Sequence, residues 1–265
     1  MQVLQKLWSR EGVLPALLAA AYSVTCLGYA WRFHQFSCKT FSFLWGNYGY
    51  TEAFAGNVER AMVVLFLLSA VCIWIRPLRR LALLGAGAML IEMLSETFVP
   101  AAKYPTIYWA EWALRFSVPV AAILLFKSGK VCEERSARIM RVAIALVFAA
   151  HGIKALLAEP QFLDFLLVTF RRLEMGMDEG QALMLLHVIG TVDLIVAAHL
   201  LFLRPVCNRG VLLWMAAWGA ITAFSRVTYG GWGNWHEVMI RTTHWLVPLV
   251  LYLQSRWRLS STESG

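Results

Sequence analysis

Long apolar runs separated by short polar loops constrain the fold of this sequence more than any other feature. About 20 apolar residues let one helix cross a bilayer, and a spanning helix pairs its own backbone polar groups. Only 15% of the residues are charged, against about 25% in ordinary soluble domains. We therefore predict an all-α, polytopic transmembrane helical bundle of about eight helices. The runs lie near 12–31, 58–75, 81–99, 107–126, 139–157, 183–203, 211–229 and 236–254.

The distribution of Lys and Arg predicts the orientation of the bundle. Basic residues are more frequent in the predicted loops on the side of both termini, as at 76–80 and 127–141, than in the loops opposite. Cytoplasmic loops of membrane proteins carry this excess. We expect a multi-pass protein of the cytoplasmic (inner) membrane with both termini in the cytoplasm and the lipid bilayer as its main partner. Because the basic clusters alternate with apolar runs, the net charge of +8 does not indicate nucleic-acid binding.

The chain also reads as an internal duplication, with a first, degenerate four-helix repeat in 1–130 and a second in 131–265. IRPLRR at 75–80 and LRPVCN at 203–208 each end one apolar run and begin the next. An even number of helices in each repeat gives both repeats the same orientation, so the repeats are parallel. We expect no broken helices at matching positions of the two halves.

A Glu-x-x-x-Arg spacing occurs once in each predicted repeat, at 111–115 and 237–241. Residues four apart share a helix face, so we predict the ion pairs Glu111–Arg115 and Glu237–Arg241. Ionisable groups within a membrane span are expensive and by default indicate function. The alternative, that such pairs only hold the helices together, stays open from the sequence.

With the predicted orientation, most ionisable residues of the spans lie in the outer half of the bilayer. This asymmetry predicts a polar chamber reached from outside or from the outer leaflet. The long connections 32–57 and 160–182 could cover it, and we expect the second to lie in the membrane interface. The expected reactive residues are His151, Asp193 and His244. The expected binding residues are Lys154, His187, Arg226, Glu237, Arg241, Glu111 and Arg115.

Metal and haem sites find little support in the sequence. The five cysteines form no C-x-x-C pair, which argues against a redox pair or a structural metal site. Histidines could ligate haem or a metal, but four of the intramembrane histidines are expected at one depth, which disfavours a transmembrane haem pathway. Any metal ligand is unknown from the sequence, and haem or metal is disfavoured relative to a quinone.

The segment RVAIALVFAAHGIKALLAEPQFLDFL at 141–166 begins with Arg and ends its apolar span with His-Gly and Lys. It resembles the first helix and loop of DoxX-like membrane proteins, and the resemblance extends over about 141–255. Asp193 would be the acidic residue of the second helix, and the Arg-rich turn at 204–209 would follow it. Residues 12–127 would be a copy without the His-Gly-x-Lys signature. The chain departs from the family in its doubled length.

The resemblance implies a four-helix unit and a link to membrane redox chemistry, since one branch of the family is similar to the small membrane subunit of thiosulfate:quinone oxidoreductase. The chain has no haem, flavin or disulfide motif of its own, so a redox role would need a partner subunit.

The first hypothesis is therefore a quinone- or redox-associated membrane component whose outward-facing pocket binds a quinone head group or a small anion. In it, His and Asp side chains relay protons and Arg241 stabilises the anionic form. The alternatives are a transporter or exporter of a small solute or lipid, and a non-catalytic membrane assembly subunit. The sequence leaves open both the identity of the small-molecule ligand and whether the chain is an enzyme.

Overall fold

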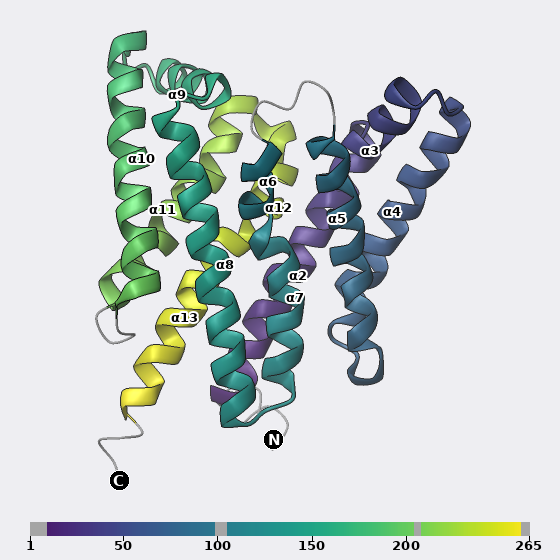
Figure 1. Cartoon of the computed structure of the whole chain (residues 1–265), viewed down its shortest axis with the longest axis vertical. Coiled ribbons are helices and arrows are strands. Elements are labelled where there is room, and N and C mark those ends of the chain that lie inside the picture. The colour runs from purple at the N-terminus through teal and green to yellow at the C-terminus, as the bar shows by residue number, and fades with distance from the viewer. Residues whose placement is uncertain (1–9, 99–104, 204–207, 261–265) are drawn as a thin grey trace.

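Helices form all the regular structure of the residues described by the computed structural model, which are 10–98, 105–203 and 208–260. The chain traces a bundle in which most long helices run roughly along one direction (Figure 1). The first half contains α2 (Arg10–Gln35), α3 (Lys39–Ser42), the π-helix η1 (Phe43–Asn47), α4 (Glu52–Cys72), the 3-10 helix η2 (Arg76–Ala82), α5 (Leu83–Thr97), α6 (Pro105–Glu111) and α7 (Ala113–Phe126). The second contains α8 (Lys130–Leu156), α9 (Pro160–Arg172), α10 (Glu179–Phe202), α11 (Arg209–Gly230), the 3-10 helix η4 (Trp232–Asn234), α12 (Trp235–Ile240) and α13 (Thr242–Ser260).

Six segments of the described chain are long and apolar enough to cross a membrane: Gly12–Gln35, Glu52–Cys72, Thr106–Phe126, Lys130–Leu156, Glu179–Phe202 and Arg209–Gly230. The surface of α4 carries Val64, Leu68 and Val71, each more than half exposed. Contiguous exposed apolar surface of this kind is unusual in soluble monomers. The all-helical class and a multi-pass membrane protein agree with the sequence prediction. The predicted eight spans are met only in part, because α5 has 15 residues and the last span is interrupted.

The two ends of the bundle differ. Helix α2 begins and α13 ends at the lower end in Figure 1, whereas α9 crosses the upper end. Helix α9 lies within the predicted connection 160–182 and ends at Arg172. Its position across one end of the bundle agrees with the expectation that this connection covers that end. Part of the second Arg-Pro turn, 204–207, lies outside the described residues. The repeat boundary at 130/131 stays a prediction, and it falls at the start of α8.

Two helices are interrupted by a single residue, and this contradicts the expectation of no matching breaks. Trp112, with φ −89° and ψ −5°, separates α6 from α7. Arg241, with φ −93° and ψ 6°, separates α12 from α13. Both residues lie near the sparsely populated bridge region. Neither Trp nor Arg is a helix breaker, and no proline lies within six residues of either one, so neither break has a local signal in the sequence.

The first helix of each half packs against the interrupted helix of the other half. Helix α2 contacts α12 and α13, and α8 contacts α6 and α7. At Gly28 a Cβ atom would lie 2.8 Å from the Ile240 nitrogen, so only glycine permits this approach. The Thr25 hydroxyl donates to the carbonyls of Met239 at 3.4 Å and Ile240 at 3.5 Å. Side chains of α2 thus support the backbone next to the break at Arg241.

Candidate functional site

A cavity of about 650 Å³ lies within the second half, between α8, α9, α10, α11 and α13. Its size falls within the range of small-molecule sites. Most of its wall is apolar and aromatic: Phe148, Phe162, Phe165, Phe170, Trp218 and Phe224. Its polar lining groups are His151, Thr169, Asp193, Thr222, Ser225, Arg226, Thr228, Arg241 and His244.

The three residues predicted to be reactive all line this cavity, and each comes from a different helix. The imidazole rings of His151 on α8 and His244 on α13 are stacked, with centroids 6.0 Å apart and 11° between their planes. Asp193 on α10 is 4% exposed, and its Oδ1 has no hydrogen-bond partner among the described residues. Leaving a buried polar group unpaired costs about 1–3 kcal/mol. The cavity therefore presents an acceptor that a ligand could satisfy.

Arg226 brings a positive charge into the apolar cavity. Its guanidinium lies 4.3 Å from the centre of the Phe165 ring. Arg226 forms no ion pair with another described residue, and its Nε is buried without a hydrogen-bond partner. Burying an unpaired charge is costly. Arg226 is thus available to a carbonyl oxygen or an anionic group of a ligand.

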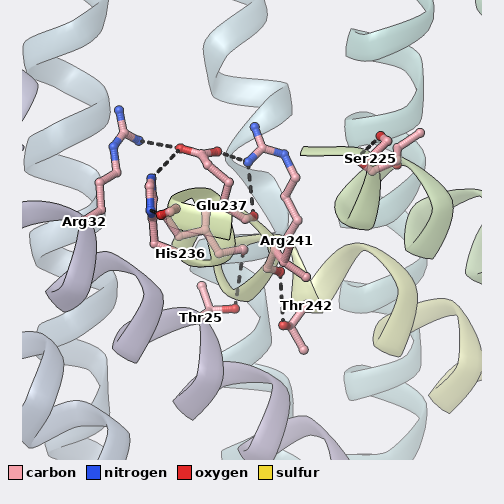
Figure 2. Close-up of polar contacts among 11 residues, drawn as sticks. Thr25, Arg32, Ser225, His236, Glu237, Arg241 and Thr242 are labelled. Carbon is pink, nitrogen blue, oxygen red and sulfur yellow. Dashed lines mark hydrogen bonds and ion pairs between the residues drawn. The ribbon is translucent and has the colours of Figure 1, made fainter. Parts of the chain in front are cut away.

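Arg241 also lines the cavity, but Glu237 neutralises it. Figure 2 shows the Glu237 carboxylate between Arg32 on one side and Arg241 on the other. The predicted Glu237–Arg241 pair is present. Its third member, Arg32, was not predicted from the sequence; the Arg32 Nη1 atom lies 3.9 Å from the Glu237 carboxylate. His236 Nε2 lies 3.6 Å away. Glu237 does not line the cavity; it positions Arg241 and connects the two halves.

The predicted Glu111–Arg115 pair is wrong. The Glu111 carboxylate instead accepts a hydrogen bond from Lys154 Nζ at 2.9 Å and lies 3.6 Å from His151 Nε2. Arg115 lies over the Trp112 ring, 4.0 Å from its centre. The helix break at Trp112 separates Glu111 from Arg115, and α8 passes beside α6, so the carboxylate turns to α8. Lys154 is consequently a partner of Glu111 and does not line the cavity.

His187 also lies apart from the expected site. It is exposed on the outer face of α10 and borders a shallow surface groove with Met184 and Thr191. Asp193 follows six residues later, and at 3.6 residues per turn six residues do not share one helix face. The predicted depth of the two residues in the bilayer stays a prediction, but the expected direction of His187 toward the site is wrong.

Several polar residues that line the cavity were not predicted from the sequence. Thr222, Ser225 and Thr228 of α11 are spaced by three, so they follow one side of the helix. The spacing was visible in the sequence, but Ser and Thr are common in membrane helices and bond to their own backbone. Thr228 Oγ1, for example, donates to the Ser225 carbonyl at 2.7 Å. This pattern alone did not distinguish a binding face from ordinary helix packing.

The cavity reaches the side of the bundle. Ile221 and Phe224 of α11 line it, and they are 58% and 47% exposed on the surface. Residues of α9, including Phe162 and Thr169, form the wall at the end of the bundle. A ligand dissolved in the surrounding lipid would therefore meet the cavity through the wall formed by α11.

Among the described residues, no three His, Cys, Asp or Glu side chains gather closely enough to hold a metal ion. The expectation that haem and metal are disfavoured stays a prediction. No protein-family model, curated protein or solved structure matches the chain. The resemblance to DoxX-like proteins likewise stays a prediction from the sequence.

Proposed function

We propose that this membrane protein binds a quinone-class molecule in the cavity of its second half and serves a redox system of the cytoplasmic membrane. The observation that carries the proposal is the meeting of His151, Asp193 and His244 in one aromatic-lined cavity. A planar head group fits beside aromatic side chains, and its two oxygens need hydrogen-bonding partners. The exposed wall at Ile221 and Phe224 suits a ligand with a lipid-soluble tail.

The side chains of the cavity have chemistry suited to quinone reduction, which consumes two electrons and two protons. A separate redox partner subunit would supply the electrons, as the sequence hypothesis requires. Imidazoles and carboxylates exchange protons with bound groups, so the stacked pair His151 and His244, together with Asp193, would deliver the protons. Arg226 would stabilise negative charge on the head-group oxygen. The proposal includes two predictions from the sequence: that the chain is DoxX-like and that both of its termini are cytoplasmic.

Binding can be measured by titrating the detergent-purified protein with a short-chain ubiquinone and following the quenching of tryptophan fluorescence. Arg226→Gln and His244→Gln should each weaken binding about tenfold, the effect of losing about 1.4 kcal/mol. His187→Gln is the matched control, because its side chain lies outside the cavity, and its affinity should equal that of the unchanged protein. Equal affinities for all three variants, or no binding by the unchanged protein, would reject the proposal.

Transport of a solute or lipid is the second candidate, and the matching breaks at Trp112 and Arg241 favour it. In many secondary transporters, discontinuous helices lie at the repeat interface and contact the substrate. Glu111 directly precedes the break at Trp112, and Glu237 lies one helical turn before the break at Arg241. Flux into proteoliposomes that falls with Glu111→Gln or Glu237→Gln would support transport. The non-catalytic assembly subunit remains if Arg226→Gln and His244→Gln leave quinone binding unchanged and Glu111→Gln and Glu237→Gln leave flux unchanged.

A further inference from the structure

The two halves can be aligned by their helix breaks rather than by the Glu-x-x-x-Arg spacing. Trp112 and Arg241 share nearly the same φ and ψ and are 241 − 112 = 129 residues apart. The Val-Pro pairs at 118–119 and 247–248 have the same separation, 248 − 119 = 129. In this register the counterpart of Arg115 is His244, since 244 − 115 = 129. The Glu residues, 237 − 111 = 126 apart, are not equivalent.

Helices α4 and α10 align through their N-caps. Thr51 accepts a hydrogen bond from the backbone N–H three residues on, at 3.3 Å, and Asp178 does the same at 2.8 Å. An N-cap side chain that accepts this bond fixes where a helix begins. The two caps are 178 − 51 = 127 residues apart. The same separation makes Phe66 the counterpart of Asp193, since 193 − 66 = 127.

Helices α2 and α8 align through their reciprocal ion pairs. Arg32 of α2 reaches Glu237 of α12, and Lys154 of α8 reaches Glu111 of α6. In each case a basic residue near the end of a half's first helix meets a carboxylate within one turn before the break in the other half, although the two carboxylates themselves are not equivalent. A second contact supports the same register: the Arg115 guanidinium lies 5.7 Å from the centre of the Tyr29 ring, and the ring of its counterpart His244 lies 6.0 Å from the His151 ring. Arg32 and Lys154 are 154 − 32 = 122 residues apart.

That separation pairs Tyr29 with His151, since 151 − 29 = 122. The first-half counterparts of the cavity residues pack against one another. The Tyr29 and Phe66 rings are stacked with centroids 5.2 Å apart, and both side chains are fully buried. The Trp112 ring lies 5.8 Å from the Tyr29 ring. Arg115 covers the Trp112 ring. Aromatic rings and one stacked guanidinium thus fill the place that corresponds to the cavity.

In the second half, polar and mostly smaller side chains stand at these four positions and line the cavity: His151, Asp193, Arg241 and His244. We infer that the two halves carry one ancestral site in two forms, open in the second half and plugged by aromatic side chains in the first. The residue pairs 29/151 and 66/193 determine which half can take a ligand. The part of this inference that concerns ligand binding rests on the proposed function; the open and plugged forms do not.

The test exchanges these residues between the halves. The variant His151→Tyr/Asp193→Phe, the plugged variant, places the first-half pair in the second half. It should bind short-chain ubiquinone at least about tenfold more weakly and still fold in detergent, because the same ring pair packs fully buried in the first half. The converse variant Tyr29→His/Phe66→Asp should lower Tm and leave ubiquinone affinity unchanged. If this double variant does not assemble, Phe66→Leu removes one of the two rings without burying a charge. It too should lower Tm and leave ubiquinone affinity unchanged.

A readout independent of quinone separates this inference from the proposed function. Thr222→Cys places a thiol on the cavity wall, and its reaction with N-ethylmaleimide can be followed by mass spectrometry. The thiol should react several-fold faster in the otherwise unchanged protein than in the plugged variant. Equal rates would overturn the inference whether or not quinone binds. It would also be overturned by a plugged variant that keeps its ubiquinone affinity, or by first-half variants that lose it.

Discussion

His151 belongs to two networks at once. Its Nε2 lies 3.6 Å from the Glu111 carboxylate, and its ring stacks on His244 in the cavity. The side chain therefore connects the ion pair between the halves with the ligand site. A change at Glu111 should reach the cavity through this imidazole, although Glu111 itself does not line it.

Cys38 provides a prediction at the scale of one residue. It lies between α2 and α4, is buried, and its Sγ accepts a hydrogen bond from the Phe41 N–H at 3.2 Å. Burial, and then the nearby Glu92 carboxylate, raise the pKa of the Cys38 thiol well above its ordinary value. Because the thiolate is the reactive form, iodoacetamide at pH 8 should modify the half-exposed Cys132 well before Cys38.

Mass spectrometry of peptides after timed alkylation assigns the rate to each cysteine. Modification of Cys38 as fast as that of Cys132 in the folded protein would contradict the buried position of this thiol. Alkylation in denaturant is the control, since both cysteines should then react alike.

At the residue scale the sequence predicted position along a helix better than direction around it. His151, Asp193 and His244 were expected at one depth, and they do meet in one cavity. His187 was expected there too, yet it faces outward. Direction depends on which neighbour each helix packs against, and this information is not contained in the spacing of one helix.

Helix α8 crosses α10 at two glycines, which gives a prediction at the scale of elements. A Cβ on Gly190 would lie 2.7 Å from the Gly152 carbonyl oxygen. Gly190→Ala should therefore force α8 and α10 apart and destabilise the protein by about 1–3 kcal/mol, the usual cost of overpacking. Gly87→Ala in α5 is the matched control, because a Cβ there meets no atom within 4 Å. A fall in Tm for Gly87→Ala equal to that for Gly190→Ala would contradict this packing.

The Glu111–Lys154 pair gives a second prediction at this scale. Lys154 is 8% exposed, and breaking a buried pair by removing one partner costs about 3–5 kcal/mol. Lys154→Met should therefore lower Tm strongly, whereas Lys130→Met, at an exposed position on the same helix, should not. Glu111→Gln combined with Lys154→Met should recover part of the loss, because the unpaired carboxylate is then absent. Additive losses in the double variant would show that the two side chains do not interact.

The sequence predicted the long helices because apolar runs of spanning length have few alternatives in a membrane. It did not predict the breaks at Trp112 and Arg241, where neither residue is a helix breaker. It also misassigned the partner of Glu111, since the ion pair follows the crossing of α6 by α8. Residue spacing within one helix does not predict contacts between helices that are far apart in the chain.

On the scale of the whole molecule, each half supplies a helix to the other. Helix α2 packs on α12 and α13, and α8 packs on α6 and α7. A chain of 131–265 expressed alone should consequently be unstable, and co-expression with 1–130 should restore a complex that co-purifies in detergent. Pull-down from membranes through a tag on one half measures this. A stable second half without the first would contradict the interlocked arrangement.

The most direct test of the proposed site is photolabelling with an azido-ubiquinone, followed by peptide mapping. The label should fall on α9 and α11, within 162–170 and 218–228, whose residues line the cavity. An excess of short-chain ubiquinone should suppress it, and the plugged variant His151→Tyr/Asp193→Phe should abolish it. Labelling that instead centres on Tyr29 and Phe66, or that excess ubiquinone does not suppress, would contradict a specific quinone site in the second half.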